Sequence, residues 1–112
     1  MKYKDEVIIQ ITKIVDNEPE ELTISPFIQR AMTIADAVSI SDTKKEIVVT
    51  SILDGVHSSK SLHYKGLAFD IRTYIYTQYE ISKLMGSLKY MLGPNYDVVL
   101  EKNHIHIEYD PK

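Results

Sequence analysis

The sequence contains no cysteine. Disulfides and thiolate metal sites are therefore excluded, and any metal would have to bind through His, Asp or Glu. No apolar run approaches the roughly 20 residues of a membrane span. The opening residues, Met1 to Glu6, lack the apolar core of a signal peptide. We therefore expect a chain without a signal peptide or membrane partner, made in the cytoplasm and reaching other compartments only with outside help such as lysis.

The sequence also lacks an excess of basic residues. The net charge is −3, and acidic and basic side chains are interspersed. A nucleic-acid binder would need a basic stripe to displace counterions, so we expect no nucleic-acid partner. The length of 112 residues, with 44% apolar and 26% charged residues, fits one globular domain spanning 1–112. We expect it to be a monomer.

Hydrophobic periodicity predicts an α+β domain in which a small, mostly antiparallel sheet packs with two main helices. One helix begins at Ser25-Pro26, an N-cap followed by proline, and runs to about Val38. A capping box at Thr77–Glu80 begins the other, which Gly93-Pro94 ends. Asp54 to Lys65 is predicted to be a loop. Strands are predicted over Glu6–Val15, Glu46–Ser51, Leu67–Thr73, Tyr96–Leu100 and His104–Tyr109, with the last two forming a hairpin.

The four histidines all lie in the second half of the chain, at positions 57, 63, 104 and 106. Strand alternation places His104, His106 and Glu108 on one face and the apolar Ile105 and Ile107 on the other. A half-buried strand needs apolar residues on one face alone, so the His-x-His-x-Glu face must meet something polar.

His63 and Asp70 lie seven residues apart, and Gly66 between them allows a sharp turn that lets the two converge. Together with a histidine of the His104-x-His106 pair they offer two nitrogen ligands and one carboxylate. Such a set leaves a fourth tetrahedral position open for water, which is typical of a catalytic zinc site. The sequence therefore predicts one zinc ion.

The segment Ser61-Leu62-His63-Tyr64-Lys65-Gly66-Leu67-Ala68-Phe69-Asp70 matches the pattern S-x-H-x-x-G-x-A-x-D. That pattern, with a later H-x-H, resembles the zinc D-Ala-D-Ala carboxypeptidase and L-alanyl-D-glutamate endopeptidase family. The resemblance implies the Hedgehog/D,D-peptidase-like zinc-peptidase fold and zinc ligation by His63, Asp70 and His106. It also implies that His104 contacts the substrate or stabilises the oxyanion, and that Ser61 supports the loop on the zinc side. The alternative for Ser61 is that it only caps a turn. The compact length looks like that of the small bacteriophage endolysin peptidases, which act on peptidoglycan stem peptides of the bacterial cell wall.

Two positions depart from that family. Many members carry an acidic general base three residues before the last zinc ligand, where this chain has Asn103. An amide cannot accept a proton at neutral pH, which leaves three interpretations. Asn103 marks an inactive form of the enzyme, Glu101 serves as the base instead, or the domain binds a peptide without cutting it.

The second departure is the arginine that often holds a substrate carboxylate in the family. Leu53-Asp54-Gly55 occupies that stretch here, so an anionic terminus would need Lys60, Lys65 or Arg72. His57 is either a hydrogen-bonded loop residue or a substrate contact.

The function we predict is a zinc metallopeptidase that hydrolyses an amide bond of peptidoglycan stem peptides, as a D,D-carboxypeptidase or L,D-endopeptidase. It would act on the cell wall after release or within a virion. The alternative is a non-hydrolysing, zinc-containing module that binds the cell wall or sits in a virion. In a third interpretation the metal only stabilises the fold.

Overall fold

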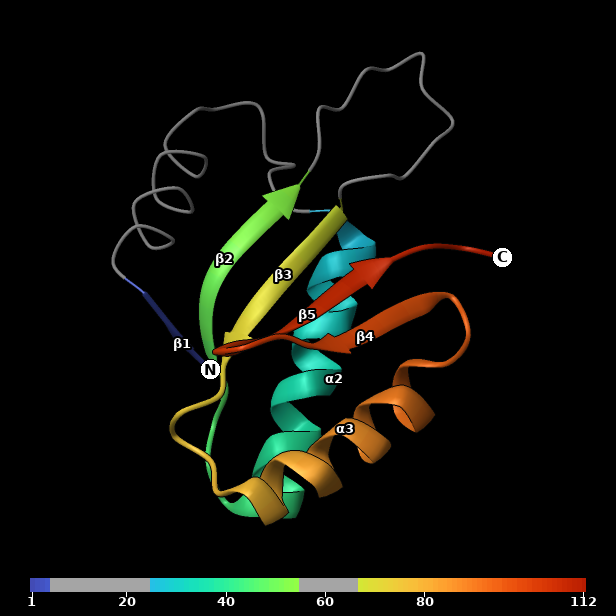
Figure 1. The fold of residues 1–112 in the computed structure, drawn as a ribbon. Coiled ribbons are helices and arrows are strands. Elements are labelled where there is room, and N and C mark those ends of the chain that lie inside the picture. The colour runs from blue at the N-terminus through green and yellow to red at the C-terminus, as the bar shows by residue number, and fades with distance from the viewer. Residues whose placement is uncertain (5–24, 55–66) are drawn as a thin grey trace.

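The computed structural model of the chain describes residues 1–4, 25–54 and 67–112, which form two layers (Figure 1). One layer is a five-stranded sheet in the order β1-β2-β3-β5-β4, and the helices cover one of its faces. The elements are β1 (Lys2–Tyr3), α2 (Pro26–Thr43), β2 (Val48–Asp54), β3 (Leu67–Arg72), α3 (Gln78–Leu92), β4 (Tyr96–Leu100) and β5 (His104–Tyr109).

The predicted α+β class is confirmed. In the described ranges two helices pack on a mixed sheet in which β1 and β2 run parallel and the other neighbouring strands run antiparallel. The predicted hairpin of β4 and β5 is present, with Tyr96 opposite Tyr109 and Leu100 opposite Ile105. No helix in these ranges combines the length and apolar character needed to cross a bilayer.

Helix α2 begins as predicted, with the Ser25 side chain accepting a hydrogen bond from the Phe27 N–H at 3.1 Å. Its predicted end near Val38 is wrong, because the helix continues to Thr43. The Thr43 hydroxyl donates to the Ser39 carbonyl at 2.8 Å, and Lys44, at φ 64°, closes the helix in the left-handed region. The apolar stripe stops before this last polar turn, so periodicity does not reveal it.

Helix α3 matches its prediction, and the capping box at Thr77 and Glu80 is present. β2 is shifted from the predicted Glu46–Ser51 to Val48–Asp54, which makes Asp54 part of a strand rather than of the loop. β1 was not predicted, because two residues are too few to show a period. The predicted strand Glu6–Val15 lies outside the described residues, as does the rest of the predicted loop.

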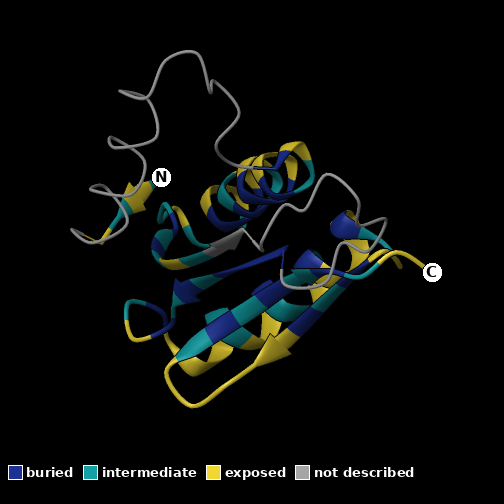
Figure 2. Ribbon diagram, turned by 90° about the horizontal axis from the view of Figure 1, so that it is seen from above, coloured by how far each residue is buried: buried dark blue, intermediate teal, exposed yellow. Residues whose placement is uncertain are grey.

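The core lies between the sheet and the helices. Alternate strand residues point into it, and the strands in Figure 2 show this as alternating buried and intermediate segments. Helices α2 and α3 each contribute one apolar stripe, since residues three or four apart share a face. The fully or nearly buried residues include Ile28, Ala31 and Ala35 from α2, Leu84 and Leu88 from α3, and Val49, Phe69, Ile71, Ile105 and Ile107 from the sheet.

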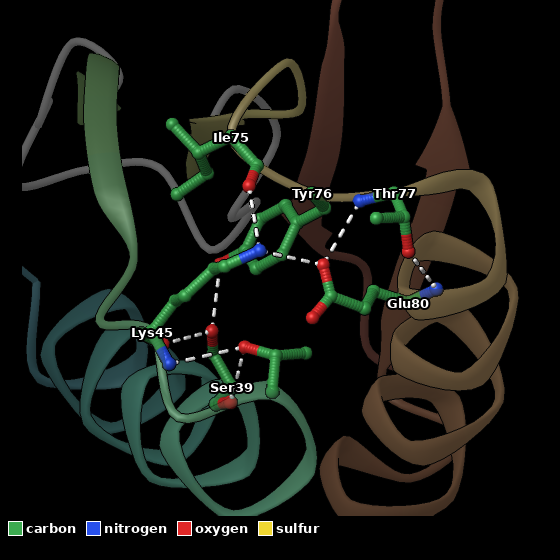
Figure 3. A network of polar contacts seen from close by, with 7 residues as sticks. Ser39, Lys45, Ile75, Tyr76, Thr77 and Glu80 are labelled. Carbon is green, nitrogen blue, oxygen red and sulfur yellow. Dashed lines mark hydrogen bonds and ion pairs between the residues drawn. The ribbon is translucent and has the colours of Figure 1, made fainter.

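A polar network joins the end of α2 to the start of α3 (Figure 3). The buried Ser39 hydroxyl donates to the Lys45 carbonyl at 2.5 Å and lies 2.6 Å from the Tyr76 hydroxyl. The Lys45 ammonium donates to the Ile75 carbonyl at 2.9 Å and to the Glu80 carboxylate at 2.7 Å. Because Ser39 uses its proton on a carbonyl, the Tyr76 hydroxyl must be the donor to Ser39.

We expect Ser39→Ala to lower the free energy of unfolding by about 1–3 kcal/mol, because it leaves the Tyr76 donor buried without a partner. Tyr76→Phe should cost less, since Ser39 keeps its bond to Lys45. The double variant should be less destabilised than the sum of the two single variants. Urea unfolding of all four proteins measures the coupling, and strictly additive losses would contradict the shared bond.

Candidate functional site

Polar side chains collect on the sheet face turned away from the helices, over β3 and β5. The two strands pair antiparallel, with Asp70 opposite His106 and Arg72 opposite His104. Phe69, Ile71, Ile105 and Ile107 alternate with these residues and fill the core on the other face. Since successive strand residues point to opposite faces, burial of the apolar set directs the polar set outward together. The predicted alternation of both strands is confirmed.

His106 lies at the centre of this cluster between two carboxylates. Its Nδ1 is 2.8 Å from Asp70 Oδ1, and its Nε2 is 3.1 Å from Glu108 Oε1. Ionised carboxylates only accept hydrogen bonds, so both contacts are made together when both ring nitrogens carry a proton, and this arrangement favours the imidazolium form. The contact with Asp70 follows from register, because the two residues face each other directly across neighbouring strands.

The two carboxylates also change the proton affinity of His106. Burial lowers its pKa, but the hydrogen bonds to Glu108 and Asp70 and their negative charges outweigh this. The net result is a pKa above the ordinary value of 6.5. The folded protein therefore holds the His106 proton more tightly than the unfolded chain does.

We expect the stability of the metal-free protein to fall as the pH rises from below 6.5 through the raised pKa of His106. Below 6.5 both states carry the proton and the stabilisation is complete. Above that value the unfolded chain loses the proton first, so the folded state binds more protons and its stability decreases with pH. Urea unfolding across this range measures the slope. His106→Gln should flatten it, and a slope unchanged in that variant would assign the effect to another group.

His104 occupies the same face beside Asp70. Its Nδ1 lies 2.7 Å from the amide oxygen of Asn103, and its Nε2 lies 3.8 Å from Asp70 Oδ2. The amide oxygen accepts, so Nδ1 carries a proton and Nε2 faces the cluster. Asn103, predicted as the position of a missing base, thus holds the ring of His104 in this structure. Glu101 is exposed, and its backbone N–H donates to the His104 carbonyl at 2.8 Å.

Arg72 extends the cluster at the end of β3. Its guanidinium carbon lies 4.9 Å from the centre of the Tyr74 ring, a cation–π contact. It forms no ion pair with a carboxylate among the described residues. A cation on this face next to His104 suits an anionic group of a ligand.

The structure brings together Asp70, Arg72, His104 and His106 of the predicted site residues. His57, Lys60, Ser61, His63 and Lys65 lie outside the described residues, so the structure does not place the third predicted zinc ligand. Within the described ranges no group of three or more His, Asp or Glu side chains is arranged to hold a metal ion. Asp70 and His106 form the described part of the predicted ligand set.

The chain matches no protein-family model, no curated protein and no solved structure. The candidate site therefore depends on its own geometry and on the sequence pattern.

Strand alternation placed Glu108 on the face of His104 and His106 but did not identify the partner of its carboxylate. In the structure Glu108 Oε1 lies 3.1 Å from Nε2 of His106. The spacing of two along one strand was the available signal, because it sets both side chains on the same face.

Proposed function

We propose that this chain is a zinc metallopeptidase that hydrolyses an amide bond of peptidoglycan stem peptides. One zinc ion would be held by His63, Asp70 and His106. The sequence pattern supports the peptidase class, and the 2.8 Å contact between Asp70 and His106 is the structural observation that most supports the ligand set.

The chemistry of these two residues fits zinc. Ligand atoms about 2.0–2.2 Å from a tetrahedral zinc ion lie roughly 3.4 Å from one another. The Asp70 and His106 atoms are 2.8 Å apart, so a small side-chain rotation is enough to bring them to that separation. His106 would present Nδ1, the nitrogen that faces Asp70, while its Nε2–H stays on Glu108.

A zinc ion at this site would polarise the amide carbonyl and lower the pKa of a bound water to about 7. The protein's own residues would then orient the peptide and handle the proton. His104 Nε2 faces the cluster and, when protonated, can donate to the oxygen that gains negative charge. Arg72 can hold a substrate carboxylate on the same face. Glu101, or an acid at position 103, would accept the proton.

Asn103 favours a second candidate function, a zinc-containing module that binds the cell wall or a virion without hydrolysis. Its amide makes a hydrogen bond to His104 but cannot act as a base. The two functions share the metal site and differ in turnover.

Mass spectrometry of purified muropeptides incubated with the zinc-loaded protein tests the proposal. Cleavage that is lost on chelation, and lost in Asp70→Asn, would support the peptidase, and the fragment masses would identify the bond. Binding of muropeptides without cleavage, in this chain and in Asn103→Asp, would favour the binding module. The absence of both binding and cleavage would overturn both functions.

A further inference from the structure

Strand β4 is an edge of the described sheet, with β5 on one side and no other described strand on the other. The Glu101 N–H donates to the His104 carbonyl, and the Asp110 N–H to the Asn95 carbonyl. Since bonded and non-bonded pairs alternate along an antiparallel ladder, Val98 and Leu100 direct their N–H and C=O groups away from β5. These groups form a row available to an added strand.

The edge lacks several of the usual protections against added strands. Tyr96 to Leu100 contains no lysine or proline, and its register with β5 has no bulge. Val99 and Leu100 are 43% and 48% exposed. An edge of this kind is competent to pair with an extended chain.

Two hollows lie beside this edge, between β4 and α3. One, of about 690 Å³, is lined by Lys89 and Tyr90 of α3, by Pro94, and by the first residues of β4. The other, of about 480 Å³, is lined by Ile81 and Met85 of α3 with Gln78 and Ser82, and by Leu100 with Thr73, Glu101 and Lys102. An added strand would therefore place alternate side chains over α3, toward these hollows.

The position of α3 decides between a peptide and a second copy of the chain. α3 packs against β4 itself, along the edge (Figure 1). Antiparallel pairing of two β4 edges would bring both α3 helices to the same side of the joined sheet and to the same place. A single extended peptide brings no helix and avoids that conflict.

The charges indicate what the peptide carries. Lys89 forms no ion pair with a described carboxylate, whereas Asp97 in the same hollow is paired with Lys112 at 3.5 Å. On its α3 side the hollow near Leu100 offers two apolar side chains, Ile81 and Met85, beside the polar Gln78 and Ser82. We propose that the β4–α3 groove binds an extended peptide as a sixth strand, with an apolar side chain over Ile81 and Met85 and a carboxylate at Lys89. The two side chains share a face, so they lie an even number of residues apart.

Two acetylated, amidated hexapeptides test this on the metal-free protein. One has leucine and glutamate four positions apart among threonines, and its partner has lysine in place of glutamate. Amide NMR titration should show shifts at Val98 and Leu100 with the glutamate peptide and weaker binding of the lysine peptide. Lys89→Glu should reverse that preference.

Leu100→Pro is the backbone test. The N–H of Leu100 points outward, so proline at this position removes a donor to the peptide without breaking the ladder to β5. The affinity for the glutamate peptide should fall about tenfold. Leu100→Ala keeps the N–H and controls for loss of the side chain. Lack of shifts with both peptides, or a charge preference unchanged in Lys89→Glu, would overturn the proposal. These results are independent of zinc and of muropeptide cleavage.

Discussion

Asn103→Asp is expected to increase the rate of muropeptide hydrolysis by about 10²–10⁴-fold, the range that a general acid–base group contributes. The Asn103 amide oxygen lies 2.7 Å from His104 Nδ1, so an aspartate there can keep that hydrogen bond with one oxygen. Its second oxygen would be free to accept a proton. Initial rates with saturating zinc, measured by mass spectrometry of the fragments, give the ratio.

Two matched variants separate a new base from a general effect of charge. Lys102→Gln lowers the charge by the same one unit at the neighbouring exposed position without adding a carboxylate, and should leave the rate unchanged. Glu101→Gln in the background of Asn103→Asp should also have little effect if position 103 supplies the base. The base would be Glu101 instead if Asn103→Asp and the original chain hydrolyse at equal rates and the single variant Glu101→Gln loses activity.

The fold was predictable where periodicity extends over several residues. Helix α3 carries both an apolar stripe and a capping box, so its start and end were found. β5 alternates over its whole length and was also placed correctly. β1 and the last turn of α2 were missed because the first is two residues long and the second is polar. The position of β1 depends on its tertiary pairing with β2, whereas the end of α2 is set by local bonds from Thr43 to Ser39 and from Lys44 to Ile40.

The candidate site was predictable as a face and less so as a set of contacts. Alternation placed Asp70, His104 and His106 outward, but it could not show that Asp70 and His106 stand opposite each other. That contact depends on strand register, which sequence spacing within one strand does not reveal. The bond between Asn103 and His104 was concealed for a different reason, since an exposed amide next to a strand carries no signal of its partner.

Glu108→Ala is expected to weaken zinc binding by about 10–100-fold, the usual effect of removing a carboxylate that orients a ligating histidine. With Glu108 in place, the Nε2–H of His106 is held at 3.1 Å and Nδ1 faces Asp70. Zinc then has to displace only the Nδ1 proton. Without Glu108 the ring can turn, and its neutral form can place the remaining proton on Nδ1. Competition with a chromophoric chelator measures the affinity.

Zinc affinities of the original chain and of Glu108→Ala should be compared above the raised pKa of His106. Below it zinc competes with a proton, and loss of Glu108 lowers the pKa of the ring, which would partly mask the weaker zinc binding. Asp97→Ala is the matched control, because Asp97 lies opposite Glu108 on the neighbouring strand. This substitution removes the same charge from the same face but leaves the hydrogen bonds of His106 intact. Glu108→Gln keeps an acceptor oxygen and should retain most of the affinity. Equal losses in Glu108→Ala and Asp97→Ala would reduce the role of Glu108 to its charge. A loss specific to Glu108→Ala would mean that the hydrogen bond on Nε2 selects the nitrogen that binds the metal.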